Sequence, residues 1–95
     1  MTKREETALT LSDACMLLVK AEIPDYLYTI GGLGAGECVG IIEKDGEWQT
    51  YFSEKGAARN LVVHPDENAA CRAFLNGVAE IMEEYTGRVV NWKFP

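Results

Sequence analysis

The chain has 95 residues, of which 47% are hydrophobic and 25% charged, and its formal net charge is −6. This length and composition are typical of one globular domain, spanning residues 1–95. The negative charge disfavours binding to nucleic acids and to anionic membranes, which repel it. No apolar run approaches the roughly 20 residues of a transmembrane helix. The start of the chain lacks the basic segment and long apolar core of a secretion signal, so we expect a cytoplasmic protein.

The negative charge is concentrated in the middle of the chain. Between Glu22 and Glu54 lie seven acidic residues and one base, Lys44, so this stretch carries 1 − 7 = −6, while the eight acids and eight bases elsewhere cancel. A concentrated negative field attracts a cationic partner through long-range steering. The competing interpretation is that an acidic surface only improves solubility.

The first expected element is a helix over residues 10–23, TLSDACMLLVKAEI, because its apolar residues recur at helical spacing. Thr10 or Ser12 can cap its N-terminus. Pro24 is expected to end it, because proline disfavours helical geometry in the residue before it.

Three strands are expected next, over residues 25–30, 37–44 and 47–54. The second and third are joined by Asp45-Gly46, one of the strongest hairpin signals. We therefore predict a three-stranded antiparallel meander. Residues 56–60 are expected to be a connection, followed at most by a short extended piece, Leu61 to Val63.

A second helix is expected over residues 64–85, with Pro65 in its first turn and Gly87 after its end. A last strand is expected over residues 88–94, where one face would hold Val90, Trp92 and Phe94. The predicted fold is α+β, with the order α-β-β-β-α-β and two layers in which both helices cover one face of the sheet. The opposite face would be left to solvent or to a partner.

The glycine-rich segment between the first two strands nearly matches a phosphate-binding loop. Gly31 and Gly36 have the spacing of G-x-x-x-x-G-K-[ST], but Glu37 and Cys38 replace the lysine and the hydroxyl residue. A carboxylate there would repel phosphate, and the residues that follow have a strand pattern and not a helical one. We interpret the segment as a hairpin connection that can also contact a partner.

Little in the sequence points to catalysis or to metal and cofactor binding. His64, the only histidine, precedes Pro65 at an expected helix start, where it is best explained as a cap. Carboxylate pairs such as Glu43 and Asp45 are typical of solvated surfaces. The three cysteines are odd in number, form no C-x-x-C motif and are interpreted as buried thiols. We therefore expect no enzyme activity, no cofactor and no metal.

Tyr51 is the aromatic residue most suited to binding. In the alternating pattern of residues 47–54 it lies on the opposite face from Trp48, among polar residues and near Asp45 and Glu47. An exposed tyrosine among carboxylates can anchor a partner, although single surface tyrosines are common.

The pattern as a whole resembles the small immunity proteins of bacterial polymorphic toxin and contact-dependent growth inhibition systems. The resemblance covers about Thr10 to Glu84 and is carried by Ile23-Pro24-Asp25, Tyr28, Gly31-Gly32, Gly46, Trp48, Tyr51, Glu54, Gly56, Ala70 and Phe74. Lys55 and Val63 depart from the arginine and the aromatic residue that are frequent in the family, and the glycine loop is longer.

The resemblance implies a protein that binds and neutralises a cognate toxin domain, often a nuclease, by covering its active or substrate-binding surface. The acidic surplus independently favours such a cationic partner. From the charge pattern we predict the contact residues Glu37, Glu43, Asp45, Glu47, Tyr51 and Glu54. Alternatives are a regulatory or adaptor module that binds a basic protein, a small enzyme that uses His64 or Cys38, and a ligand sensor that uses the glycine loop.

Overall fold

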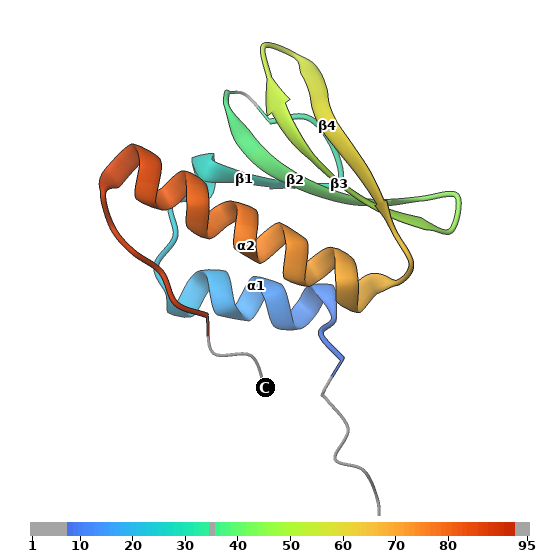
Figure 1. The fold of residues 1–95 in the computed structure, drawn as a ribbon, viewed down its shortest axis with the longest axis horizontal. Helices are drawn as coiled ribbons and strands as arrows, with labels where there is room; N and C mark the ends of the chain where they lie inside the picture. Colours follow the sequence, from blue (N-terminus) through green and yellow to red (C-terminus); the bar gives the residue numbers. More distant parts are fainter. Residues whose placement is uncertain (1–7, 35, 93–95) are drawn as a thin grey trace, which may run out of the picture.

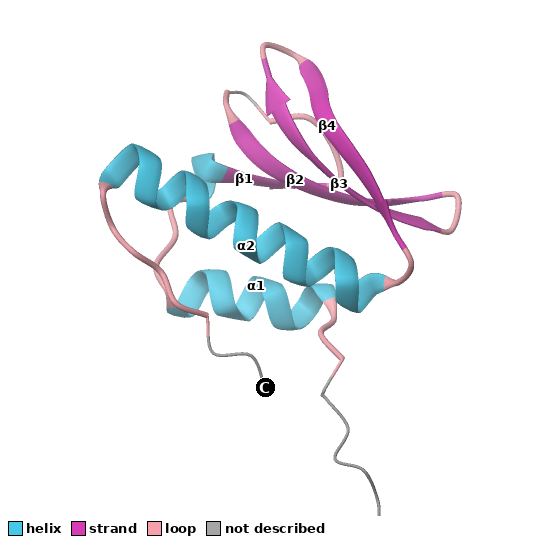
Figure 2. Ribbon diagram, in the orientation of Figure 1, coloured by secondary structure: helices cyan, strands magenta, loops and turns pink. Residues whose placement is uncertain are grey.

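The structure is a computed structural model that describes residues 8–34 and 36–92. Within these residues the chain forms helix α1 (Leu11–Lys20), a 3₁₀ turn η1 (Asp25–Leu27), strands β1 (Tyr28–Ile30), β2 (Cys38–Lys44), β3 (Glu47–Glu54) and β4 (Ala57–His64), and helix α2 (Glu67–Thr86). The strands form one mixed sheet in the order β1-β2-β3-β4, with both helices on the same side of it (Figure 1, Figure 2). The predicted α+β class is confirmed. The predicted order is wrong, because the chain runs α-β-β-β-β-α.

Strand β1 runs parallel to β2, so the predicted meander is wrong at its first strand. The register places Tyr28 beside Val39 and Ile30 beside Ile41. Parallel neighbours usually require a crossover of about a dozen residues, yet only residues 31–37 connect these two strands. The glycine-rich segment is therefore a short crossover and not a hairpin connection. Gly31 begins it with a φ of +86°, a conformation that favours glycine.

Two tight hairpins join β2 to β3 and β3 to β4. In each turn both central residues have positive φ, as a two-residue type I′ turn requires: Asp45 (54°) and Gly46 (82°), then Lys55 (52°) and Gly56 (77°). The first was predicted from Asp45-Gly46. The second was missed, because lysine is not a usual residue at positive φ. The predicted connection over residues 56–60 is consequently part of β4.

Helices α1 and α2 run parallel and are joined at both ends. Near their N-termini, the Leu9 N–H donates to Asn68 Oδ1 at 2.8 Å and the Leu11 N–H donates to Glu67 Oε2 at 2.7 Å. Near their C-termini, the Arg88 guanidinium donates to the carbonyl oxygens of Ala21 and Glu22, which directly follow α1. The carboxylate of Glu67 thus satisfies a first-turn N–H of α1 and lies at the positive end of both helices.

Each helix has a recognisable cap. Of the two predicted caps, Thr10 and Ser12, it is Thr10 that caps α1, and it forms a capping box with Asp13. Asp66 caps α2, which begins at Glu67 and not at residue 64. At the end of α1, the Glu22 N–H donates to Val19 O and the Ile23 N–H donates to Leu18 O. These two bonds form a Schellman motif. The helix therefore ends at this motif, and the prediction that Pro24 ends it is wrong.

Helix α2 packs on β2, β3 and β4, and α1 packs along α2. The fully buried Phe74 of α2 meets Tyr28 edge-on, with ring centroids 6.3 Å apart. The predicted last strand is wrong for residues 88–92, which are not extended into a sheet; Lys93 and Phe94 lie outside the described residues. Here Val90 and Trp92 pack on the core, and the Trp92 Nε1–H donates to Leu75 O at 2.7 Å. The alternating apolar pattern thus reflects packing and not strand pairing.

The Schellman motif places Glu22 at a φ of 56°, where glycine is normally found. Replacing Glu22 with glycine should raise the free energy of unfolding by about 1 kcal/mol, because it removes the strain of a side chain in this conformation. The measurement is chemical denaturation. The matched control, Glu83→Gly on the exposed face of α2, should lower the same quantity by about 1 kcal/mol. Destabilisation by both substitutions would contradict the assignment of this cap.

Candidate functional site

The glycine crossover lies on the face of the sheet opposite the helices and is bonded to β3. The Gly32 N–H donates to the Tyr51 hydroxyl at 3.1 Å, and that hydroxyl donates to Gly32 O. The Gly34 N–H donates to Ser53 Oγ at 3.1 Å. These backbone donors are therefore engaged within the protein, whereas a phosphate loop leaves its N–H groups free for the anion.

Tyr51 does not have the exposed position expected for an anchor. Its side chain is only 7% exposed, and its ring lies over Gly40, its register partner on β2. A Cβ at Gly40 would fall 2.2 Å from this ring, so only glycine fits there. Burial raises the pKa of the Tyr51 hydroxyl, which therefore acts as a neutral hydrogen-bonding group. Tyr51 fixes the glycine crossover and is not a free contact residue.

The predicted acidic contact residues separate into two groups. Glu43, Asp45 and Glu47 are exposed at the β2–β3 turn, and we call them the turn acids. Glu37 and Glu54 lie at the opposite end of the same hairpin, because Cys38 pairs with Ser53. At about 3.3 Å per residue, β3 separates the two groups by roughly 20 Å. One compact site containing all of these residues is therefore excluded.

Helix α2 adds acidic residues to the second group. The Tyr85 hydroxyl donates to Glu37 Oε1. This bond, followed by desolvation and the negative charges of Glu37, Glu84 and Glu54, raises the pKa of Tyr85 to about 12. Glu37, Glu54 and Glu84 are therefore close enough to act on one phenol. Glu54 also forms an ion pair with Arg59 at 3.1 Å, which at this exposed position contributes little.

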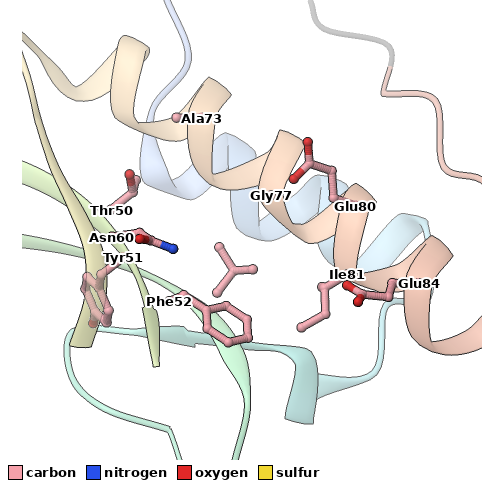
Figure 3. A pocket seen from close by; sticks show the side chains of 10 residues that line it. Thr50, Tyr51, Phe52, Asn60, Ala73, Gly77, Glu80, Ile81 and Glu84 are labelled. Atoms are coloured by element: carbon pink, nitrogen blue, oxygen red, sulfur yellow. The ribbon is translucent and has the colours of Figure 1, made fainter. Parts of the chain in front are cut away.

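Beside these residues, a cleft of about 370 Å³ opens between α2 and the β3–β4 hairpin. Its apolar wall contains Val39, Phe52 and Ile81. Figure 3 shows Thr50 and Asn60 on the strand side and Glu80, Ile81 and Glu84 on the helix side. We call the acids of the cleft and of its neighbourhood the cleft acids: Glu37, Glu54, Glu80 and Glu84.

The cleft exists because small residues face it from α2. Ala73 and Gly77 line it one turn apart, and a Cβ at Gly77 would lie 3.1 Å from Val39 Cγ1. The contact residues predicted from the charge pattern did not include the glutamates of this helix. The available signal was the helical spacing of Ala73, Gly77 and Glu84, which places small residues and an acid on one stripe. The residues that face this stripe could not be identified from the sequence, because β4, which contributes Asn60 to the cleft, had not been predicted.

The other residues considered for chemistry have structural surroundings. His64 ends β4, and its Nε2 lies 2.8 Å from Thr50 Oγ1, so it does not cap a helix as predicted. Cys38 and Cys71 are buried as expected, whereas Cys15 is only partly buried. Burial raises the pKa of the Cys38 and Cys71 thiols, to about 11 for Cys71. A thiol that stays protonated is a poor nucleophile. Within residues 8–34 and 36–92, no group of three or more His, Cys, Asp or Glu side chains is placed to hold a metal ion.

Comparison with protein-family models, with curated proteins and with solved structures finds no match to this chain. In the part of the chain that the structure describes, neither helix is long and apolar enough to span a bilayer. The inference about function therefore depends on the surface itself: a cleft with an apolar wall and acidic residues around it.

Removing the Tyr51 hydroxyl should loosen the glycine crossover. Tyr51→Phe is expected to lower the free energy of unfolding by about 1–3 kcal/mol, because both the N–H and the carbonyl of Gly32 lose their partner. Urea denaturation measures the change. The matched control, Tyr26→Phe at a well-exposed position, should leave stability within about 0.5 kcal/mol of wild type. Equal effects of the two substitutions would show that Tyr51 does not fix the crossover.

The hydrogen bond to Glu37 should be visible in a spectrophotometric titration of Tyr85. Because the neutral phenol is the donor, the stabilisation from this bond is fully present below pH 10 and is lost as pH rises through about 12. The tyrosinate absorbance that Tyr85→Phe removes should therefore appear only near pH 12. Glu37→Gln should shift that transition towards 10, and the control Glu43→Gln should not. An unshifted transition in Glu37→Gln would contradict the contact.

Proposed function

We propose that this protein is an immunity-type inhibitor that binds and neutralises a toxin domain with a basic surface, such as a nuclease. The resemblance carried by its sequence motifs supports this class of function. The observation that carries the proposal is the cleft between α2 and β3, where an apolar wall lies beside Glu80 and Glu84.

This combination suits the side chain of an arginine or lysine from a partner. Both side chains have an apolar stem and a cationic head. The stem would lie against Phe52 and Ile81, and the head would reach the carboxylates of Glu80 and Glu84. Because these two glutamates are four residues apart on one helix, they repel each other by a few tenths of a kcal/mol. A bound cation would remove this repulsion.

The remaining acids would act over a longer range. A protein with net charge −6 attracts a basic partner before contact, and this steering raises the association rate. A nuclease presents cationic residues where it binds the nucleic-acid backbone, so an inhibitor that pairs with them blocks the substrate. An interface of about 800 Å² per partner is the usual size for such a complex.

The two acidic groups give different expectations for binding. Replacing both Glu80 and Glu84 with glutamine should raise the dissociation constant by at least about tenfold. We expect most of this change in the dissociation rate, because charge pairs that become buried in a complex act mainly on that rate. The control, Glu43→Gln with Glu47→Gln, removes the same charge from the turn acids and should change mainly the association rate, by less than about tenfold.

The measurement is surface plasmon resonance with the toxin domain encoded by the neighbouring gene, together with protection of cells during co-expression. If no complex forms and cells are not protected, the proposed function is wrong. If the complex forms but only the turn-acid variant weakens it, the function stands and the binding surface moves to the β2–β3 turn.

A further inference from the structure

Strand β4 is an edge strand with unusual exposure. Leu61, Val62 and Val63 are 52%, 49% and 51% exposed, although they are consecutive aliphatic residues in the sheet. Edge strands are normally protected from pairing by lysine, proline or a bulge at the exposed stretch. Here the bulge lies between the Arg59 and Val62 pairings with β3, so it contains Asn60, with a φ of 55°, and Leu61. Val62 and Val63 follow it in regular strand geometry, with no lysine or proline beside them.

The distribution of charge identifies what such an edge can pair with. The segment Ala57–His64 contains one base, Arg59, and no acid. Two copies of a protein with net charge −6 repel each other at most orientations. The eight-residue strand β4 has no carboxylate of its own, so two copies can approach along its edge without these strands repelling each other.

We propose that two copies of this chain pair antiparallel through their β4 edges around a two-fold axis. In the register that best matches the sequence, Val62 lies opposite Val62 of the second copy, and Leu61 lies opposite its Val63. Leu61 and Val63 point to the same face, since they are two residues apart in a strand. The pairing therefore brings two residues from each copy into one apolar stripe across the joined sheet.

The one base of β4, Arg59, lies before the bulge and is paired with Glu54 of its own copy, so it adds no repulsion between the two edges. The arrangement is isologous and uses the β4 edge of both copies, so it closes at two.

Sedimentation velocity of the whole chain tests the association without any other partner. We expect a dimer at micromolar concentrations that strengthens as salt screens the repulsion between the two acidic bodies. Val62→Glu should give a monomer, because the two-fold axis would place glutamates directly opposite each other. The control Val19→Glu makes the same change at a 73% exposed position on α1 and should remain dimeric. A wild-type protein that stays monomeric at high salt would overturn the proposal.

Disulfide trapping tests the register, in a Cys15→Ala background that keeps the buried Cys38 and Cys71. With oxidised glutathione as the oxidant, two thiols form one disulfide and two molecules of reduced glutathione are released. Val62→Cys should form a covalent dimer, because each new thiol faces its own symmetry mate. Val63→Cys faces Leu61 and should form at least about tenfold less. Preferential trapping of Val63→Cys would overturn this register.

The proposal goes beyond the proposed function, and the two fail independently. Self-association is measured on the isolated chain and strengthens with salt. Capture of a basic toxin domain requires that domain and weakens with salt. A monomer that still protects cells would overturn only the dimer, whereas a dimer that binds no toxin would overturn only the inhibitor.

Discussion

The fold depends on the contact between Tyr51 and Gly40. Because Gly40 has no side chain, the ring of its neighbour on β3 lies directly over β2, and its hydroxyl reaches the backbone of Gly32. This bond holds the glycine crossover against the sheet, which allows β1 to pair parallel with β2 through a connection of only residues 31–37. A side chain at residue 40 would displace the ring and leave both backbone groups of Gly32 without a partner.

A second glycine has a comparable effect on the other face. Gly77 brings α2 close to Val39 of β2, while further along the same face the β3–β4 hairpin leaves the helix and the cleft opens. Because the sheet twists while the helix is straight, α2 contacts the sheet closely at β2 and is separated from it at the β3–β4 hairpin. The apolar wall and the cleft acids therefore result from how this helix crosses the sheet, and not from a separate binding motif.

The sequence predicts much of the fold and less of the surface, for physical reasons. Asp45-Gly46 is recognisable because both residues accept positive φ, whereas Lys55-Gly56 forms the same turn with a residue that seldom does. Missing that turn removed β4 and made the alternating residues 88–94 look like the last strand. Local patterns also could not show that the crossover covers Tyr51, since a ring that faces away from the helices is normally exposed.

The acidic residues show a similar division. Counting charges along the chain locates the surplus between Glu22 and Glu54, and these residues do carry the turn acids. It does not show that Glu84 of α2 comes beside Glu37 and Glu54, because that proximity is created by packing. The cleft acids therefore combine Glu37 and Glu54, which were predicted from the sequence, with Glu80 and Glu84, which only the folded chain brings beside them.

The position of β4 explains how an acidic protein can keep an apolar edge exposed. Edge strands usually carry their own protective charges, and here the charges lie on the neighbouring elements: the turn acids at one end of β3 and the cleft acids at the other and on α2. Such charges keep molecules apart in most orientations, while an edge without acids remains free to pair. The acidic residues and the edge that we propose to pair thus lie on different elements of the same small fold.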